Sequence, residues 1–159
     1  MIERSLVLLK PDAVQRGLMG KIICRFEDAG LKAVGVKMVW VKTEFAQKHY
    51  AAHLEKSFYP GLEKMITEGP VLALVLEGLH AVETVRKMVG PTEPKTAAPG
   101  TIRGDFAHHS YEYTDKKGIA IKNLIHASGN IAEAKEEIKL WFEDKELHTY
   151  ETVHEKHVF

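Results

Sequence analysis

The sequence lacks the features that mark secreted, membrane-spanning and nucleic-acid-binding proteins. Its 159 residues contain a single cysteine, Cys24, which cannot form an internal disulfide and suits a reducing compartment. No apolar run approaches the roughly 20 residues that a membrane-spanning helix needs. The 22 basic residues balance 22 acidic ones, so no net positive charge favours nucleic acid or an anionic membrane. We therefore expect a cytoplasmic protein that binds no membrane and no specific nucleic acid.

Both common glycine-rich phosphate-binding loops are also absent. Residues 17–21, with the sequence GLMGK, have neither the spacing nor the hydroxyl side chain of the G-x-x-x-x-G-K-[ST] loop. No G-x-G-x-x-G motif follows a predicted strand. A nucleotide bound to this protein would therefore have to be held by separate side chains together with Mg²⁺.

Apolar periodicity predicts one α+β domain over residues 1–159. Short aliphatic or alternating runs predict strands, and apolar residues at a spacing of three or four predict helices. The predicted strands are residues 5–9, 33–42, 71–76 and 119–125. The predicted helices are residues 20–30, 43–53, 62–66, 82–89 and 131–142. This order predicts a ferredoxin-like sandwich, in which a four-stranded antiparallel sheet carries helices on one face.

Two local patterns predict how side chains are placed. The second strand alternates apolar residues with others, which predicts that its apolar residues share an inward face. These residues are Val34, Val36, Met38 and Trp40. Cys24 has apolar neighbours in the first helix, which predicts a buried thiol.

His126 lies between an apolar strand and a predicted helix. Asn130 and Glu133 match a capping box at the start of that helix. A histidine in this position is held firmly and yet exposed, and its neutral imidazole is a nucleophile if a partner binds the other ring nitrogen. Glu137, two helical turns into the helix, is a candidate partner. The alternative is that His126, one of nine histidines, only ends the strand.

Cationic residues from distant parts of the chain can converge near His126. Lys10 follows the first strand, Arg86 lies on the helix after the third strand, and Arg103 lies in the long polar stretch 90–118. A phosphoryl-transfer site needs such charges because negative charge spreads over the oxygens of the transferred group. The alternative for each cation, taken singly, is a solvated surface residue.

Six segments of the chain resemble the motifs of the nucleoside diphosphate kinase family, in the same order. They are KPDAVQRGLMGKI, HYAAHLEKSFYPGL, GPVLALVLEG, VGPTEP, PGTIRGDF and NLIHASGN, and together they span nearly the whole chain. The combination of N-x-x-H-[GA]-S with G-T-I-R-G-D is specific, whereas K-P-D alone would be weak. The resemblance implies an enzyme that transfers the γ-phosphate of a nucleoside triphosphate, with ATP as the expected donor, to a nucleoside diphosphate. It implies a ping-pong mechanism through a phosphohistidine at His126.

The resemblance also assigns roles to individual residues. The implied catalytic residues are His126, Glu137, Lys10 and Tyr50, with Ser128 close to them. The residues implied to bind the nucleotide are Lys10 and Asn123 at the sugar, Arg86, Thr92 and Arg103 at the phosphates, and Phe58 and Leu62 at the base. Mg²⁺ is expected to bridge phosphate oxygens without a direct protein ligand. Stacking on the base, and sugar contacts that spare the 2′ position, imply little selectivity for base or for ribose over deoxyribose.

The chain departs from the family pattern at two places. Gly129 stands where the family usually has an aspartate, so the role of that carboxylate at the start of the next helix is either taken by Asn130 or missing. An aspartate at position 129 is expected to stabilise that helix by about 0.3–1 kcal/mol. Residues 106–118 form an insertion that we predict to be a protruding β-hairpin, with Tyr111 and Tyr113 on one face. We expect this hairpin to contact a neighbouring subunit and to leave the catalytic pocket open. The alternative is a mobile loop.

The sequence leaves other functions and the assembly open. A ferredoxin-like sheet also occurs in RNA-recognition domains, although no RNP-like aromatic strand is present. A nucleotide-binding protein without catalysis is a third alternative, which phosphohistidine formation would separate from the enzyme. His49 with His53, and His154 with His157, have metal-ligand spacing but no third ligand nearby, so we expect surface residues. Residues 147–159 are a C-terminal tail, and the family resemblance implies a homo-oligomer, commonly a hexamer and sometimes a tetramer.

Overall fold

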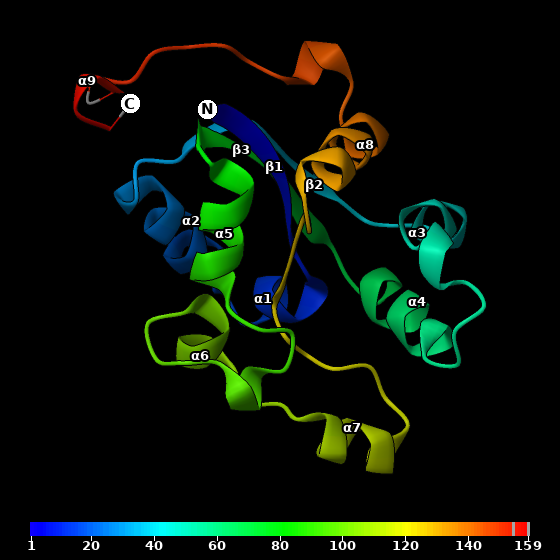
Figure 1. The fold of residues 1–159 in the computed structure, drawn as a ribbon. Coiled ribbons are helices and arrows are strands. Elements are labelled where there is room, and N and C mark those ends of the chain that lie inside the picture. The colour runs from blue at the N-terminus through cyan, green and yellow to red at the C-terminus, as the bar shows by residue number, and fades with distance from the viewer. Residues whose placement is uncertain (154, 159) are drawn as a thin grey trace.

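The computed structural model describes residues 1–153 and 155–158, and its centre is one antiparallel sheet of four strands (Figure 1). The strands lie in the order β2-β3-β1-β4. Their bounds are β1 Ile2–Leu9, β2 Lys32–Val39, β3 Val71–Leu79 and β4 Ile125–Ala127. β1 pairs with β3 along its whole length, whereas β4 pairs only with the end of β1. The predicted α+β fold with a four-stranded antiparallel sheet is confirmed.

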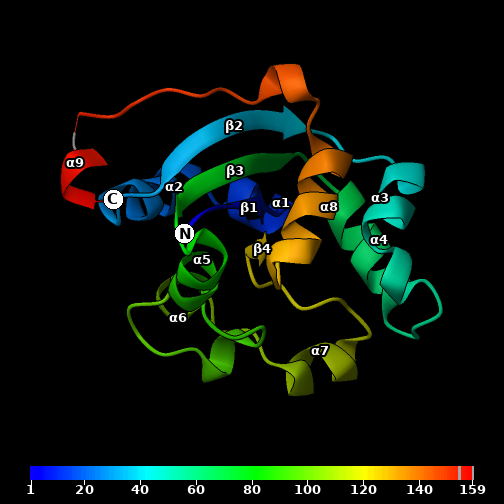
Figure 2. The ribbon, with the colours of Figure 1, turned by 45° about the horizontal axis from the view of Figure 1, so that its top comes forward.

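Helices cover both faces of this sheet (Figure 2). Helices α2 and α5 pack on one face, and α3, α4 and α8 pack on the other. Their bounds are α2 Met19–Asp28, α3 Thr43–His49, α4 Tyr59–Thr67, α5 Ala81–Val89 and α8 Ile131–Trp141. The prediction of helices on one face is wrong because β1 is apolar on both sides. Leu6 and Leu8 are buried on one face, and Val7 and Leu9 are buried on the other, so both faces need a cover.

The edge strand β2 exposes an apolar stripe. Val34 is buried as predicted, but Val36, Met38 and Trp40 are more than half exposed. A β-bulge next to Val34 shifts the alternation by one residue, so the residues after it point to the opposite side from the predicted one. The predicted inward face is therefore wrong beyond Val34. We call Val36, Met38 and Trp40 the edge-strand stripe.

Cys24 lies in α2 but its thiol is exposed, so the predicted burial is wrong. Ile22 and Phe26, one turn apart, are fully buried and mark the inward face of this helix. Cys24 lies midway between them in the sequence, which places it on the opposite side of the helix. Its Sγ atom is 3.4 Å from Oδ2 of Asp28.

Within the predicted insertion, residues 106–118, helix α7 spans Tyr111–Lys117, so the hairpin prediction is wrong. The hydroxyl of Ser110 caps the first turn by accepting from the backbone N–H of Tyr113 at 3.3 Å. Gly118 ends the helix in the left-handed conformation, with φ of 61°. The capping serine and the terminal glycine favour a helix over these residues, and they determine the structure although the spacing of the two tyrosines is also compatible with a strand.

The prediction that the last strand begins at residue 119 is wrong, because β4 covers only three residues. The backbone N–H of Lys122 donates to Nδ1 of His109 at 3.2 Å, and that of Leu124 donates to the carboxylate of Asp12 at 3.0 Å. Leu124 also has a positive φ of 70°. The side chains of His109 and Asp12 thus accept hydrogen bonds that a neighbouring strand would otherwise have accepted. Pairing with β1 therefore begins only at Ile125.

Short helices complete the chain. They are α1 Pro11–Gln15, η1 Ala51–His53, η2 Pro94–Thr96, α6 Ile102–Phe106, η3 Asp144–Glu146 and α9 Glu155–Val158. The predicted helix 43–53 is split between α3 and η1. None of the helices in the described residues is both long and apolar enough to cross a membrane.

The C-terminal tail runs back along β2 toward α2 (Figure 2). The backbone N–H of His148 donates to the carbonyl of Val34 at 2.7 Å, and the Tyr150 hydroxyl donates to that of Ala33 at 2.8 Å. The tail therefore occupies part of the β2 edge. His154, which has metal-ligand spacing from His157, lies outside the described residues.

Candidate active site

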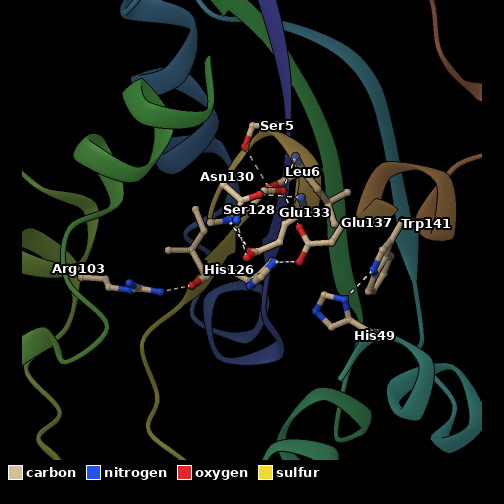
Figure 3. A network of polar contacts seen from close by, with 12 residues as sticks. Ser5, Leu6, His49, Arg103, His126, Ser128, Asn130, Glu133, Glu137 and Trp141 are labelled. Carbon is tan, nitrogen blue, oxygen red and sulfur yellow. Dashed lines mark hydrogen bonds and ion pairs between the residues drawn. The ribbon is translucent and has the colours of Figure 1, made fainter. Parts of the chain in front are cut away.

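His126 lies on β4 and faces Glu137 on α8 (Figure 3). Its Nε2 atom is 2.7 Å from Oε1 of Glu137. An ionised carboxylate only accepts hydrogen bonds, so Nε2 carries the proton of the neutral ring and Nδ1 keeps its lone pair. The His126 side chain is 26% exposed, so a substrate can reach the ring. This arrangement leaves Nδ1 as the nucleophilic atom.

Glu137 is held by β1 as well as by His126. Its Oε2 atom accepts from the Ser128 hydroxyl at 2.5 Å, and the oxygen of that hydroxyl accepts from the backbone N–H of Leu6 at 3.2 Å. Burial alone would raise the pKa of Glu137, but the hydrogen bond and charge of His126, together with the Ser128 hydroxyl, lower it. The carboxylate is thus ionised and fixed in direction from the central strand of the sheet.

The start of α8 is capped at the position that the sequence predicts. Oδ1 of Asn130 accepts from the backbone N–H of Glu133 at 2.9 Å. The Glu133 carboxylate in turn accepts from the Asn130 side-chain amide at 2.7 Å and from the backbone N–H of Gly129 at 3.0 Å. The Glu133 carboxylate thus accepts from the backbone N–H of the residue before the cap, whereas in the usual capping box it accepts from the N–H of the cap residue itself. Because this turn is fixed, Glu137 is placed one turn further along, beside His126.

His49 on α3 lies against the His126 ring, although the sequence predicted a surface residue. The two rings meet edge to face with their centres 5.0 Å apart. Trp141 donates from Nε1 to Nδ1 of His49 at 3.2 Å, so the neutral His49 ring carries its proton on Nε2. Burial, together with the nearby His126, lowers the pKa of His49 to about 3. No local pattern marks this residue, because the Trp141 contact joins residues 92 apart.

One group of side chains in the described residues could hold a metal ion. It consists of His49, His126 and Glu137, whose ligand atoms lie within 4.8 Å of one another. Each already has a partner in the protein: both oxygens of Glu137 accept hydrogen bonds, and Nδ1 of His49 accepts from Trp141. His53, which has metal-ligand spacing from His49, is exposed and does not join the group. Glu137 therefore holds the His126 ring, whereas His49 packs against that ring, is held by Trp141 and keeps a buried Nε2 atom without a hydrogen-bond partner in the described residues.

Lys10 is a buried cation at the end of β1. Its Nζ atom donates to Oδ1 of Asn123 at 2.6 Å, and the Asn123 amide donates to the Thr92 carbonyl at 2.8 Å. Burial lowers the pKa of Lys10 to about 8, against the opposing charge of Asp12 and with a further lowering by Arg103. A cation that is so poorly compensated favours a bound anion. Three predicted site residues, Lys10, Thr92 and Asn123, are thus joined in one chain of hydrogen bonds.

Arg103 on α6 is a second buried cation, and it reaches the backbone beside His126 (Figure 3). Its guanidinium donates to three backbone carbonyls, those of Gly90 at 2.9 Å, Asn123 at 3.1 Å and Ile125 at 2.5 Å. Burial and then the charge of Arg86 lower the pKa of Arg103 to about 10, against the opposing effects of Tyr111 and Asp12. Arg86 is exposed on α5. The two arginines therefore place positive charge next to β4.

A row of rings leads from His126 to Phe58. Neighbouring ring centres are between 4.6 and 6.3 Å apart along the series His126, His49, Tyr50, His53 and Phe58. Phe58 is 55% exposed, so it is not a core residue, whereas Leu62 is partly buried against the core. Tyr50 is buried, and burial together with the charge of Glu137 raises its pKa. The residues predicted for the base thus lie at the far end of this row.

Comparison with known proteins gives a single family. The family model described as nucleoside diphosphate kinase matches residues 3–147. The nucleoside diphosphate kinase of Pyrococcus abyssi is 55% identical over 148 residues, which cover 93% of this chain and 89% of the relative. That of Borreliella burgdorferi is 46% identical over 156 residues, covering 94% and 93% of the two chains.

Two solved structures share the fold. A transition-state mimic of the Borrelia burgdorferi nucleoside-diphosphate kinase with bound vanadate and ADP has a TM-score of 0.95 at 44% identity, covering 99% of this chain and 96% of that chain. A halophilic nucleoside diphosphate kinase from Halobacterium salinarum in complex with CDP has a TM-score of 0.89 at 42% identity, covering 100% and 99%. These matches confirm the resemblance that the motifs indicated: the chain belongs to the nucleoside diphosphate kinase family.

Proposed function

We propose that phosphate passes through the Nδ1 atom of His126. Family membership makes the chain an enzyme that moves phosphate between nucleotides. In the first half-reaction the Nδ1 lone pair attacks the γ-phosphorus of a nucleoside triphosphate, with ATP as the proposed donor. The bond to the bridging oxygen breaks, and its electron pair leaves on the diphosphate. In the second half-reaction a terminal oxygen of another nucleoside diphosphate attacks the phosphorus, and the N–P bond breaks.

The contact between Nε2 of His126 and Glu137 at 2.7 Å carries this proposal. The ring becomes positively charged when Nδ1 bonds to phosphorus, because Nε2 keeps its proton. An ionised Glu137 then stabilises that charge, and it also prevents the ring from turning its protonated nitrogen toward the substrate. Tyr50, buried beside His49, is proposed to support this arrangement by packing against the His49 ring.

The cations are proposed to bind the phosphates. Lys10 and Arg103 are held in place before any substrate arrives, and the exposed Arg86 can turn toward a ligand. Thr92, on the chain bonded to Asn123, would add a hydroxyl donor. These groups would stabilise charge on the transferred group without having to reorganise.

Mg²⁺ is proposed to enter on the phosphates of the nucleotide. It is a hard cation that prefers oxygen ligands, and when bound it neutralises phosphate charge. The side chains proposed to bind the phosphates include the cations Lys10 and Arg103, and both oxygens of Glu137 already accept hydrogen bonds. These residues fit an ion whose ligands are phosphate oxygens and water.

Asn123, together with Lys10 in addition to its phosphate contact, is proposed to contact the sugar. Phe58 and Leu62 are proposed to contact the base. An exposed ring offers its face to any base, so purines and pyrimidines should bind alike. The family resemblance implies sugar contacts that spare the 2′-hydroxyl. We therefore propose little selectivity for base or for ribose over deoxyribose.

The protein is proposed to work in the cytoplasm as a homo-oligomer, a hexamer with a tetramer as the alternative. The edge-strand stripe supports self-association, because an apolar edge strand readily pairs with another copy. The single exposed thiol of Cys24 suits a reducing compartment.

The test is to incubate the protein with γ-labelled ATP and Mg²⁺ and to look for acid-labile label on the chain. We expect up to one label per chain at His126, its release by any nucleoside diphosphate, and no label on the His126→Ala variant. Label on another residue, or transfer without a labelled protein, would contradict the proposal.

A further inference from the structure

Helix α7 and the residues before it are bonded to two segments of the proposed nucleotide site. The carbonyl of His109 accepts from the backbone N–H of Lys95 at 3.1 Å, and its Nδ1 atom accepts from that of Lys122 at 3.2 Å. The carboxylate of Glu93 accepts from the backbone N–H of Tyr111 at 2.8 Å. The insertion therefore lies between segments that are distant in the chain, and it holds both.

Each of these segments carries a proposed nucleotide contact. Glu93 follows Thr92 directly, and Lys122 precedes Asn123. Asn123 then joins the two through its bond to the Thr92 carbonyl at 2.8 Å, and it holds Lys10 at 2.6 Å. Two of the three ties thus end next to a residue proposed to bind phosphate or sugar, and the third ends at Lys95, three residues after Thr92.

The His109 ring is suited to a permanent acceptor role. A backbone N–H can only donate, so Nδ1 of His109 is the acceptor and the proton of the neutral ring lies on Nε2. Burial lowers the pKa of His109, with Lys122 and His108 adding to the effect and Asp12 opposing it. The ring also packs against Tyr113, with centres 5.4 Å apart. His109 is therefore held in both direction and tautomer.

We propose that His109 is a positioning residue for nucleotide binding, and that His109 and helix α7 support the nucleotide site rather than a subunit interface. The inference rests on the proposed roles of Lys10, Thr92 and Asn123. A nucleotide must contact both segments at once, and a protein that fixes their spacing beforehand loses less freedom on binding. His109 acts through the backbone of Lys122 and does not touch the reacting atoms. His109 should therefore stabilise the bound nucleotide equally in the ground state and in the transition state.

His109→Ala tests the inference, because it removes the acceptor from the Lys122 N–H. We expect the KM for both donor and acceptor nucleotides to rise about threefold to tenfold, the value of one hydrogen bond, while kcat changes less than twofold. His109→Asn should restore a KM close to that of the parent, because its side-chain oxygen can take the place of Nδ1. His108→Ala is the matched control, since His108 is exposed and has no hydrogen bond to any described residue.

Glu93→Ala and Glu93→Gln form a second pair in case His109→Ala does not fold. The alanine releases the tie to Tyr111 and should raise KM, whereas the glutamine oxygen can still accept and should not. Mass in solution and melting temperature are measured for every variant. An unchanged KM in both alanine variants, a fall in kcat alone, or loss of assembly with parental KM would overturn the inference.

Asn123→Ala separates this inference from the proposed site itself. If Asn123→Ala leaves KM unchanged, the proposed nucleotide contacts are wrong, whatever His109 does. If Asn123→Ala raises KM and His109→Ala does not, the contacts stand and only the role of His109 is wrong.

Discussion

The catalytic side and the nucleotide side of the site are held in different ways. On the catalytic side, a chain of hydrogen bonds runs from the backbone N–H of Leu6 on β1 through the side chains of Ser128 and Glu137 to His126. On the nucleotide side, Arg103 and Asn123 bond mainly to backbone carbonyls of irregular chain. The first arrangement fixes the direction of one ring, whereas the second fixes the spacing of segments. Variants on the catalytic side should therefore change rate, and variants on the nucleotide side should change affinity.

The largest effect is expected for His126→Ala. Removal of the nucleophile should lower transfer by about three orders of magnitude or more, while ADP affinity and melting temperature stay close to those of the parent. Single-turnover transfer and calorimetric ADP binding measure the two effects. A variant with near-parental turnover would show that phosphate does not pass through this residue.

Glu137→Gln should lower the rate of His126 phosphorylation by about a hundredfold and leave ADP affinity unchanged. The amide keeps a hydrogen-bond acceptor at this position but removes the negative charge that stabilises the phosphorylated ring. Rapid-quench measurement of the phosphorylated protein checks the rate. A change confined to nucleotide affinity would show that Glu137 acts in nucleotide binding and not in the transfer step.

Lys10 should make nucleotide affinity dependent on pH. Because burial lowers its pKa to about 8, Lys10 is mostly charged at about pH 7 and mostly neutral at about pH 9, so ADP affinity should fall across this range. Lys10→Gln should bind ADP about tenfold more weakly at neutral pH and should lose this dependence. Calorimetric titrations of both proteins at a series of pH values make the test. A parental pH dependence in the variant would assign the titration to another group.

The smallest effect is expected at Gly129, and the structure reverses its sign. Sequence alone predicts that an aspartate there stabilises α8. A Cβ atom at this position would lie 2.5 Å from Oε2 of Glu133, and the new charge would face that carboxylate. Gly129→Asp should therefore lower the free energy of unfolding by about 0.5–1 kcal/mol. Gly129→Ala, which adds the same Cβ without the charge, separates crowding from repulsion in thermal melts.

Much of the fold could be predicted from sequence because its signals are local. The aliphatic run of β1, the apolar spacing of α5 and the Asn130 cap of α8 each lie within one element. Predictions failed where a distant or irregular contact decides the outcome. The bulge next to Val34 reverses the exposure of the residues after it, and the His109 ring takes a bond that a strand would have used.

The candidate site shows the same division. The position of His126 at the end of a strand and that of Glu137 on the following helix are visible in the sequence, since the two residues are only eleven positions apart. His49 was not predicted to face them, because its place depends on Trp141 and on the packing of α3 against the sheet. The ties of residues 106–118 to Lys95 and Lys122 could not be predicted for a related reason, because long-range bonds leave no periodic pattern.

The identity of the phosphorylated ring nitrogen tests the central claim most directly. The protein is labelled with ATP and Mg²⁺, digested in alkali, and the phosphohistidine isomer is identified by nuclear magnetic resonance. Because Glu137 holds Nε2 of His126 at 2.7 Å, phosphate should be found on Nδ1 of His126 alone. Phosphate on Nε2, or on any other residue, would contradict the account.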